Sequence, residues 1–174
     1  VMRTAVMGDE GSERPSTPEE LDQMLALFRE AMDAGALGLG SSTNENHRGF
    51  GGVPIASRLA SDDEFRAFMR VLAEYRHGVF MITCGDHMGP PFLEELSTIS
   101  GKPSVYAPLL HYSHQPDRAG ALMRQCDAAR ARGVPVYAQA SCQPLSLSFT
   151  LDHAYILKTI SPWPATSDQA ELRR

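Results

Sequence analysis

The chain has 174 residues, of which 43% are hydrophobic and 21% are charged, as in an ordinary globular domain. Its formal net charge of −5 argues against a nucleic-acid partner or an anionic membrane surface, because both select clustered lysine and arginine. No run of about 18 apolar residues is present, so the sequence predicts no membrane span. The odd number of cysteines (Cys84, Cys126 and Cys142) indicates reduced thiols and favours a cytoplasmic protein.

The first predicted helix begins at a clear capping signal. Thr17 can cap the helix, Pro18 suits its first position, and Glu20 can complete a capping box. Apolar residues then recur at helical spacing as far as Gly35, which ends the helix. Residues 36–40 follow as a strand of small residues without polar alternation, which is typical of a parallel strand buried on both faces.

The helix–strand pattern then repeats three times. Four such pairs in succession predict an α/β fold with a parallel sheet in sequence order, right-handed crossovers and helices on one face. The later helices are expected from Ser61, which begins a second capping box with Glu64, to Gly78, at residues 92–99 and at residues 117–132; the later strands are expected at residues 79–83, 104–110 and 134–139.

Candidate functional residues are those that follow the strands, because reactive side chains of parallel α/β folds lie at the carboxyl ends of strands and in the loops beyond. The glycine-rich segment 42–59 after the first strand is long and without periodicity, which is typical of a functional loop. The candidates are Ser41, Ser42, Asn44, Glu45 and His47 after the first strand, Cys84, Asp86 and His87 after the second, His111, Tyr112 and His114 after the third, and Gln139, Ser141 and Cys142 after the fourth.

Two interpretations of these groups remain open. Cys84, Asp86 and His87 are either a turn after a buried strand, with Cys84 as a small apolar filler, or a group of zinc ligands. His111 and His114 are either a turn or a ligand pair. No nucleophile elbow, phosphate loop or dinucleotide fingerprint is present in the sequence.

Several segments, in this order and spacing, resemble the N-acyl-D-amino-acid deacylases of the amidohydrolase superfamily from residue 1 to about residue 160. They are Arg3-x-x-Val6-Met7-Gly8, the Thr-Pro-Glu-Glu-Leu helix start with Ala34-Gly35-Ala36-Leu37-Gly38, Pro54-x-x-Ser57-x-x-Ala60 with Asp63-Glu64-Phe65, Ser100-Gly101-Lys102-Pro103, and Ala128-Ala129-Arg130-Ala131-Arg132-Gly133.

The resemblance implies a metal-dependent amide hydrolase built on a (β/α)8 barrel. This chain then covers about the fourth to the seventh barrel strands, as a partial TIM barrel over residues 1–160, followed by a polar, poorly ordered tail over 161–174. A complete barrel takes about 250 residues. The family's His-x-His on the first strand and its Asp after the eighth strand are absent from this sequence. We therefore expect an interior fragment that is inactive by itself.

The resemblance also implies site residues and a zinc cofactor. Zinc ligands are expected at Cys84, His87 and His111, and substrate-binding residues at Ser42, Asn44, His47 and His114. The sequence departs from the family pattern at two strand ends: Thr83-Cys84 stands where the family has Thr-His, and Pro108 stands near the expected Ser-His, three residues before His111. These departures resemble a divergent branch with altered ligands.

The sequence therefore leads to three hypotheses about function. The leading hypothesis is a fragment of a hydrolase that acts on non-peptide amide bonds, with an N-acylated amino acid or a related amide as its small-molecule substrate. The alternatives are a self-contained small-molecule-binding α/β domain and a catalytically inactive amidohydrolase-like protein. The open edges of a partial barrel also favour self-association.

Overall fold

The computed structural model describes residues 1–49, 52–85, 88–143, 146 and 148. The expected domain end at residue 160 and the expected tail at 161–174 lie outside the described residues. The helices and strands are α1 Met2–Met7, the short 3-10 helix η1 Gly8–Ser12, α2 Pro18–Asp33, β1 Gly38–Ser42, the 3-10 helix η3 Ala56–Leu59, α3 Asp62–Ala73, β2 Val79–Thr83, α4 Pro90–Ser100, β3 Ser104–Ala107, α5 Arg118–Ala131 and β4 Val136–Ala138.

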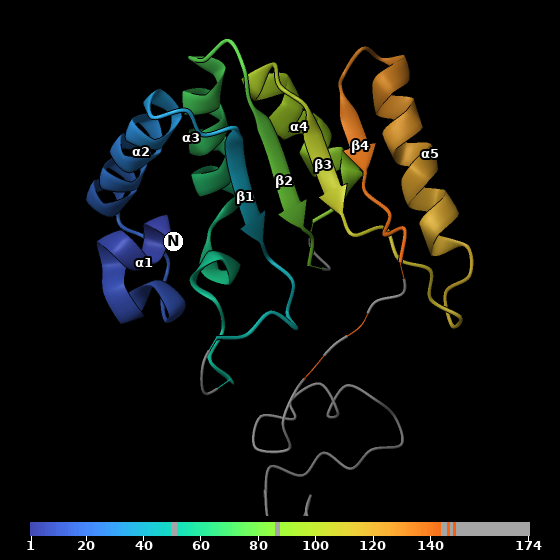
Figure 1. The fold of residues 1–174 in the computed structure, drawn as a ribbon, viewed down its shortest axis with the longest axis horizontal. Helices are drawn as coiled ribbons and strands as arrows, with labels where there is room; N and C mark the ends of the chain where they lie inside the picture. The colour runs from blue at the N-terminus through green and yellow to red at the C-terminus, as the bar shows by residue number, and fades with distance from the viewer. Residues whose placement is uncertain (50–51, 86–87, 144–145, 147, 149–174) are drawn as a thin grey trace, which may run out of the picture.

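The four strands form one parallel sheet in the order β1-β2-β3-β4, which confirms the predicted topology. Figure 1 shows the strands side by side with their arrows directed to the same end. A doubly wound domain would reverse its strand order at a switch point. The sequential order therefore favours a barrel segment over the self-contained binding domain.

The two faces of the sheet differ in burial, and the helices that the structure describes pack on one of them. Phe80 and Ile82 of β2 are fully buried, whereas Met81 between them is 43% exposed. Met81 pairs with Val105, which pairs with Tyr137, and Tyr137 is also exposed. The core contains side chains of the helix-facing side of the strands and of the helices that cover it, among them Leu39, Phe80, Ile82, Tyr106, Val136, Met24, Phe28, Phe65, Met69, Leu72, Leu93 and Leu96.

The two predicted capping boxes differ in outcome. At α2 the Thr17 hydroxyl accepts from the Glu20 N–H, and the Glu20 carboxylate accepts from the Thr17 N–H, which confirms the box. At α3 the Ser61 hydroxyl accepts from the Glu64 N–H, but the Glu64 carboxylate binds Arg3 and Ser16 instead. The second capping box is therefore only half formed, because a distant cation binds the carboxylate.

Three strand boundaries differ from those predicted. Near each boundary, a backbone N–H donates to a helix carbonyl and not to the neighbouring strand, or a proline has no N–H to donate. β1 begins two residues late, since Gly35 has φ 99° and the Ala36 N–H donates to Ala31 O of the preceding helix at 3.0 Å. β3 ends at Ala107, before Pro108, which has no N–H to donate. β4 starts only at Val136, because Val134 donates to the end of α5 and a proline follows it.

The helices α1, η1, η3 and α4 were not predicted at their observed positions. The first 12 residues form α1 and η1, and neither helix has a side-chain cap that could signal its start. The helix α4 begins at Pro90, two residues before its predicted start, since proline fits the first turn of a helix. Within the part of the chain that the structure describes, no helix has the length and apolar character needed to cross a bilayer.

Candidate functional site

The end of β1 carries a small cluster of polar side chains. Ser42, the last residue of this strand, lies level with Thr83 of β2 on the face without helices. Its hydroxyl oxygen is 2.7 Å from Nδ1 of His47, and the Asn44 N–H donates to the same oxygen at 3.2 Å. The structure therefore brings together Ser42, Asn44 and His47, three of the four residues predicted to bind substrate. The hydrogen bond to Ser42 restricts the rotation of the exposed His47 ring.

Further hydrogen bonds join the end of β1 to the end of β2. The Gly85 N–H donates to the Thr43 hydroxyl at 2.9 Å, and the Asn44 side-chain amide donates to Cys84 O at 3.4 Å. A Cβ atom at Gly85 would lie 2.4 Å from Thr43 O, so only glycine allows this close approach of the two chains. These contacts hold the Ser42 cluster at a defined position on the sheet edge.

Cys84 lies in the hydrophobic core at the end of β2 and is 8% exposed. Burial raises the pKa of its thiol to about 12, although the positive charge of Arg118 opposes this shift. The thiol contacts Ile82 O at 3.9 Å. Among residues 1–49, 52–85, 88–143, 146 and 148, no three His, Cys, Asp or Glu side chains are grouped so that they could hold a metal ion. Asp86 and His87 lie outside the described residues.

The segment between β3 and α5 forms a second polar group. Tyr112, His114, Gln115 and Arg118 line a small cavity of about 180 Å³. The Tyr112 and His114 rings are 5.6 Å apart, and the Arg118 guanidinium lies 5.3 Å from the centre of the Tyr112 ring. The same guanidinium donates to the hydroxyl of the buried Tyr106 at 3.4 Å. His114, the fourth residue predicted to bind substrate, therefore lies at the same cavity as Arg118.

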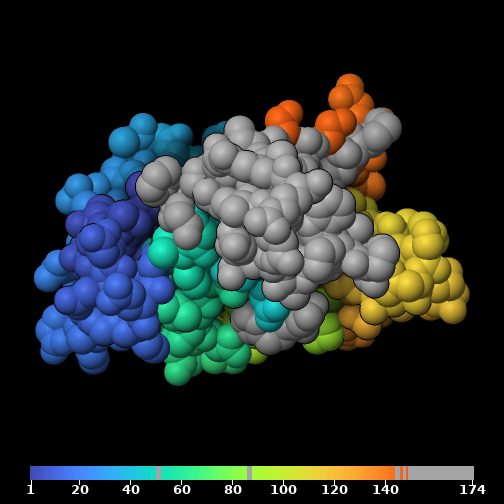
Figure 2. Space-filling view, turned by 90° about the horizontal axis from the view of Figure 1, so that it is seen from below, coloured from blue at the N-terminus to red at the C-terminus, as the bar shows by residue number. Residues whose placement is uncertain are grey.

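The two polar groups occupy different parts of the edge at which the strands end. Figure 2 looks onto this edge: the cyan and green loop after β1 lies beside the blue N-terminal helices, and the yellow segment before α5 lies on the opposite side. Their strands, β1 and β3, are separated by β2. Neighbouring strands are about 4.8 Å apart, so Ser42 and the end of β3 are separated by roughly 10 Å.

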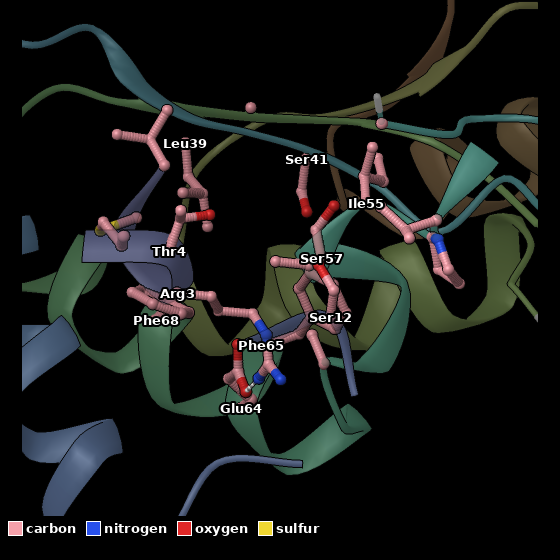
Figure 3. A pocket seen from close by; sticks show the side chains of 18 residues that line it. Arg3, Thr4, Ser12, Leu39, Ser41, Ile55, Ser57, Glu64, Phe65 and Phe68 are labelled. Carbon is pink, nitrogen blue, oxygen red and sulfur yellow. Dashed lines mark hydrogen bonds and ion pairs between the residues drawn. The ribbon is translucent and has the colours of Figure 1, made fainter. Parts of the chain in front are cut away.

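A larger cavity of about 460 Å³ lies on the helix side of β1 (Figure 3). Leu39 and Ser41 of β1, Phe65 and Phe68 of α3, and residues of α1 and η3 line it. Leu39 and Ser41 lie three residues and one residue before Ser42 in β1, so their side chains are on the other face of the strand. The cavity therefore lies on the opposite side of β1 from Ser42, away from the face on which the polar strand-end cluster lies.

A buried ion pair closes one part of this larger cavity. Arg3 of α1 donates to Glu64 of α3 at 2.5 Å, and the two side chains are 5% and 3% exposed. Arg3 also donates to Gly11 O and Arg14 O, and Ser16 donates to Glu64. Figure 3 shows the Arg3 and Glu64 side chains directed at each other. This network attaches the first helices to α3.

Sequence reasoning missed Arg118 and the Arg3–Glu64 pair. Arg118 directly follows the His111–Asp117 loop, and its position at a helix start next to that loop was the available signal. Arg3 and Glu64 are 61 residues apart, and no local pattern links them. His111 is exposed, and its predicted role as a metal ligand stays a prediction.

Comparisons with known proteins identify the fold. No protein-family model and no curated protein matches the sequence. Three solved structures match, all of D-aminoacylase. The D-aminoacylase that defines a novel subset of amidohydrolases has a TM-score of 0.62 and 22% identity, over 79% of this chain and 28% of its own.

A second match is a D-aminoacylase studied for the functional role of its binuclear metal centre, with the same TM-score and identity. The third is the D366A mutant in complex with copper, with a TM-score of 0.63 and 23% identity over 80% of this chain. The chain spans 28% of the length of these proteins. Its four parallel strands and their helices therefore have the fold of a part of D-aminoacylase.

Proposed function

We propose that this chain is part of a hydrolase that cleaves non-peptide amide bonds, of the N-acyl-D-amino-acid deacylase type. The observation that carries the proposal is the shared fold with D-aminoacylase over about four fifths of the chain. Polar side chains at the ends of β1 and β3 add support, because parallel α/β enzymes place substrate at this edge of the sheet. The substrate class is an N-acylated amino acid or a related small amide.

A metal cofactor belongs to the proposal for the whole protein, since the D-aminoacylases of the same fold include one with a binuclear metal centre. The described residues of this chain do not fit a metal shell. No three ligand side chains are grouped among them, and the Cys84 thiol is packed in the core. Zinc at Cys84, His87 and His111 thus remains a prediction from the sequence, and no chemical step is derived through it.

Ser42 at the end of β1, with Asn44 and His47 in the loop that follows, would orient the substrate in the proposed reaction. Amide hydrolysis requires a proton for the departing amine, and histidine is the side chain that most often transfers protons near neutral pH. Because Nδ1 of His47 is engaged by Ser42, its Nε2 is the atom left to hold or donate a proton. We assign His47 to substrate binding and proton exchange at this edge, with Ser42 and Asn44 as positioning residues.

The test is hydrolysis of N-acetyl-D-methionine by the protein encoded by the whole reading frame that contains this chain. We expect release of D-methionine, no release from the L enantiomer, and loss of activity with a metal chelator. The present chain by itself is expected to be inactive. Hydrolysis by this chain alone, or no hydrolysis of any N-acyl-D-amino acid by the longer protein, would contradict the proposal.

Metal analysis of the longer protein separates an active enzyme from an inactive relative. Bound metal together with turnover supports the hydrolase. A protein that folds, contains no metal and hydrolyses no amide would be the catalytically inactive amidohydrolase-like protein. Measuring the metal content of Cys84→Ala further tests the predicted ligand: unchanged metal content would make Cys84 a packing residue.

The cellular location and the partners of the protein are also part of the proposal. We propose a cytoplasmic protein without nucleic-acid or membrane partners, supported by the reduced state of its three thiols and by its negative net charge. Self-association through the outer edges of β1 and β4 is also proposed. Fractionation of the source cells tests the location.

A further inference from the structure

We infer that the larger cavity on the helix side of β1 is a binding site for a small neutral molecule with an apolar body and one carbonyl oxygen. This site is separate from the edge assigned to the proposed reaction, because the cavity lies on the opposite side of β1 from Ser42. Binding there therefore does not require the proposed hydrolase activity. The volume of the cavity, one unpaired hydrogen-bond donor and the charges of the wall support the assignment.

The volume of the cavity suits a small organic molecule. About 460 Å³ lies within the roughly 300–1,000 Å³ typical of ligand sites, and it far exceeds the roughly 30 Å³ that one water molecule occupies in the liquid. Most of the side chains that line the cavity are apolar, among them Leu39 of β1 and Phe65 and Phe68 of α3. An apolar body that fills this space leaves water, which favours binding.

Arg3, which lines this cavity, has a hydrogen-bond donor without a partner. Its Nη1 donates to Glu64, and its Nη2 donates to Gly11 O and Arg14 O. Its Nε–H is buried and has no hydrogen-bond partner in the part of the chain that the structure describes, and the whole side chain is only 5% exposed. Buried donors are nearly always paired, because an unpaired donor has lost its hydrogen bond to water without a replacement. A carbonyl oxygen in the cavity would supply the missing acceptor.

The Nε–H of Arg3 is held in place before any ligand arrives. The hydrogen bonds to Glu64 and to the two carbonyl groups fix both terminal nitrogen atoms, and the guanidinium is planar, so the direction of Nε–H is fixed as well. Figure 3 shows the Arg3 side chain across the cavity from Ser41, whose side chain points from β1 into the same space. A donor that is fixed in advance loses little conformational freedom on binding.

The charges at the cavity favour a neutral ligand over an anion. Arg3 and Glu64 are the charged side chains among the described residues that line it, and they form an ion pair. The positive charge of Arg3 is therefore already compensated. A carboxylate placed at Nε would also approach the Glu64 carboxylate, and like charges repel strongly at a buried site. The N-acyl amino acid of the proposed reaction carries such a carboxylate, so it should not occupy this cavity.

Saturation-transfer NMR with this chain tests the site, because the method observes the ligand and tolerates self-association of the protein. Acetophenone is the neutral probe with one carbonyl oxygen. In α-methylstyrene a CH2 group replaces that oxygen, and in benzoate a carboxylate replaces the acetyl group. Arg3→Lys keeps the positive charge beside Glu64 but removes the Nε–H donor. Ser41→Leu places a larger side chain in the cavity, and Ser41→Ala is its matched control at the same position without added volume.

We expect acetophenone to bind at least about tenfold more tightly than α-methylstyrene or benzoate, since hydrogen bonds to charged donors are the stronger ones. In Arg3→Lys acetophenone should bind no more tightly than α-methylstyrene. Ser41→Leu should abolish binding of acetophenone, and Ser41→Ala should retain it. Equal binding of acetophenone and either matched probe to the unmodified chain would overturn the inference, and this comparison needs no variant. Unchanged acetophenone binding in Ser41→Leu, with folding verified by circular dichroism, would also overturn it.

A competition experiment separates this site from that of the proposed reaction. N-acetyl-D-methionine at equal concentration should not displace acetophenone from the chain, because its carboxylate is excluded from the cavity. Displacement would place both molecules at one site and overturn the inference, whereas hydrolysis by the longer protein would be unaffected by that result. Conversely, a longer protein that hydrolyses no amide would refute only the proposed function.

Discussion

Replacing Glu64 with glutamine removes the negative charge of the ion pair that joins α1 to α3. Arg3 would then remain buried with its positive charge uncompensated, at a site where both side chains are at most 5% exposed. Removing one partner of a buried ion pair costs about 3–5 kcal/mol, because the remaining charge has lost its hydration without a counter-charge. Two carbonyl groups, Gly11 O and Arg14 O, still accept from Arg3 and keep the loss near the lower limit.

The expected loss of about 3 kcal/mol corresponds to a fall in Tm of roughly 6–12 °C in a domain of this size. Urea unfolding followed by circular dichroism measures the free energy directly. Glu74→Gln is the control, since Glu74 pairs with Arg29 at the surface and exposed pairs contribute little to stability. The double variant Arg3→Met with Glu64→Leu should recover most of the loss, because no charge is then left buried.

The result that refutes this reasoning is a Glu64→Gln protein as stable as Glu74→Gln. The ion pair would then not hold α1 against α3. A double variant less stable than Glu64→Gln would show instead that hydrogen bonds, such as the one from Ser16 to Glu64, and not charge compensation, dominate at this site.

Three further predictions concern the backbone, the thiols and the sheet edges. Gly38→Ala should lower soluble yield and stability, because its Cβ would lie 2.0 Å from Val79 O at φ 138°, whereas Gly40→Ala meets nothing within 4 Å; equal urea midpoints would contradict this. At pH 8, far below the Cys84 pKa of about 12, iodoacetamide should alkylate Cys84 at least about 1,000-fold more slowly than the exposed Cys142, as followed by mass spectrometry. Among the described residues β1 and β4 are the outer strands of the sheet, and their edges should cause concentration-dependent association in sedimentation velocity; a monomer at every concentration would contradict this.

Local signals in the sequence were sufficient to predict the order of helices and strands. Thr17 and Ser61 cap their helices as predicted, and Gly35, with φ 99°, follows the end of α2. The prediction that the second helix runs to Gly78 is wrong, because α3 ends at Ala73. These signals act over a few residues, so they do not depend on the rest of the fold. Four short apolar segments between such helices then leave a parallel sheet in sequence order as the simplest arrangement.

The cluster of Ser42, Asn44 and His47 could also be predicted, because all three residues lie within one loop at the end of a strand. The long-range partners could not. Whether Glu64 binds the N–H of Ser61 or the guanidinium of Arg3 depends on a residue 61 positions away. Whether Cys84 faces the core or the strand-end loops depends on the pairing and packing of β2.

Arg118 shows most clearly which features the sequence predicts and which depend on the folded structure. Its charge and its place at a helix start can be read from the sequence, but its contacts with Tyr106 and Tyr112 exist only after β3, the following segment and α5 have packed together. Periodicity and capping are properties of neighbouring residues, and so the sequence alone determined the elements and their order. The cavities, the buried ion pair and the environment of each thiol arise between distant segments, and only the tertiary structure decided them.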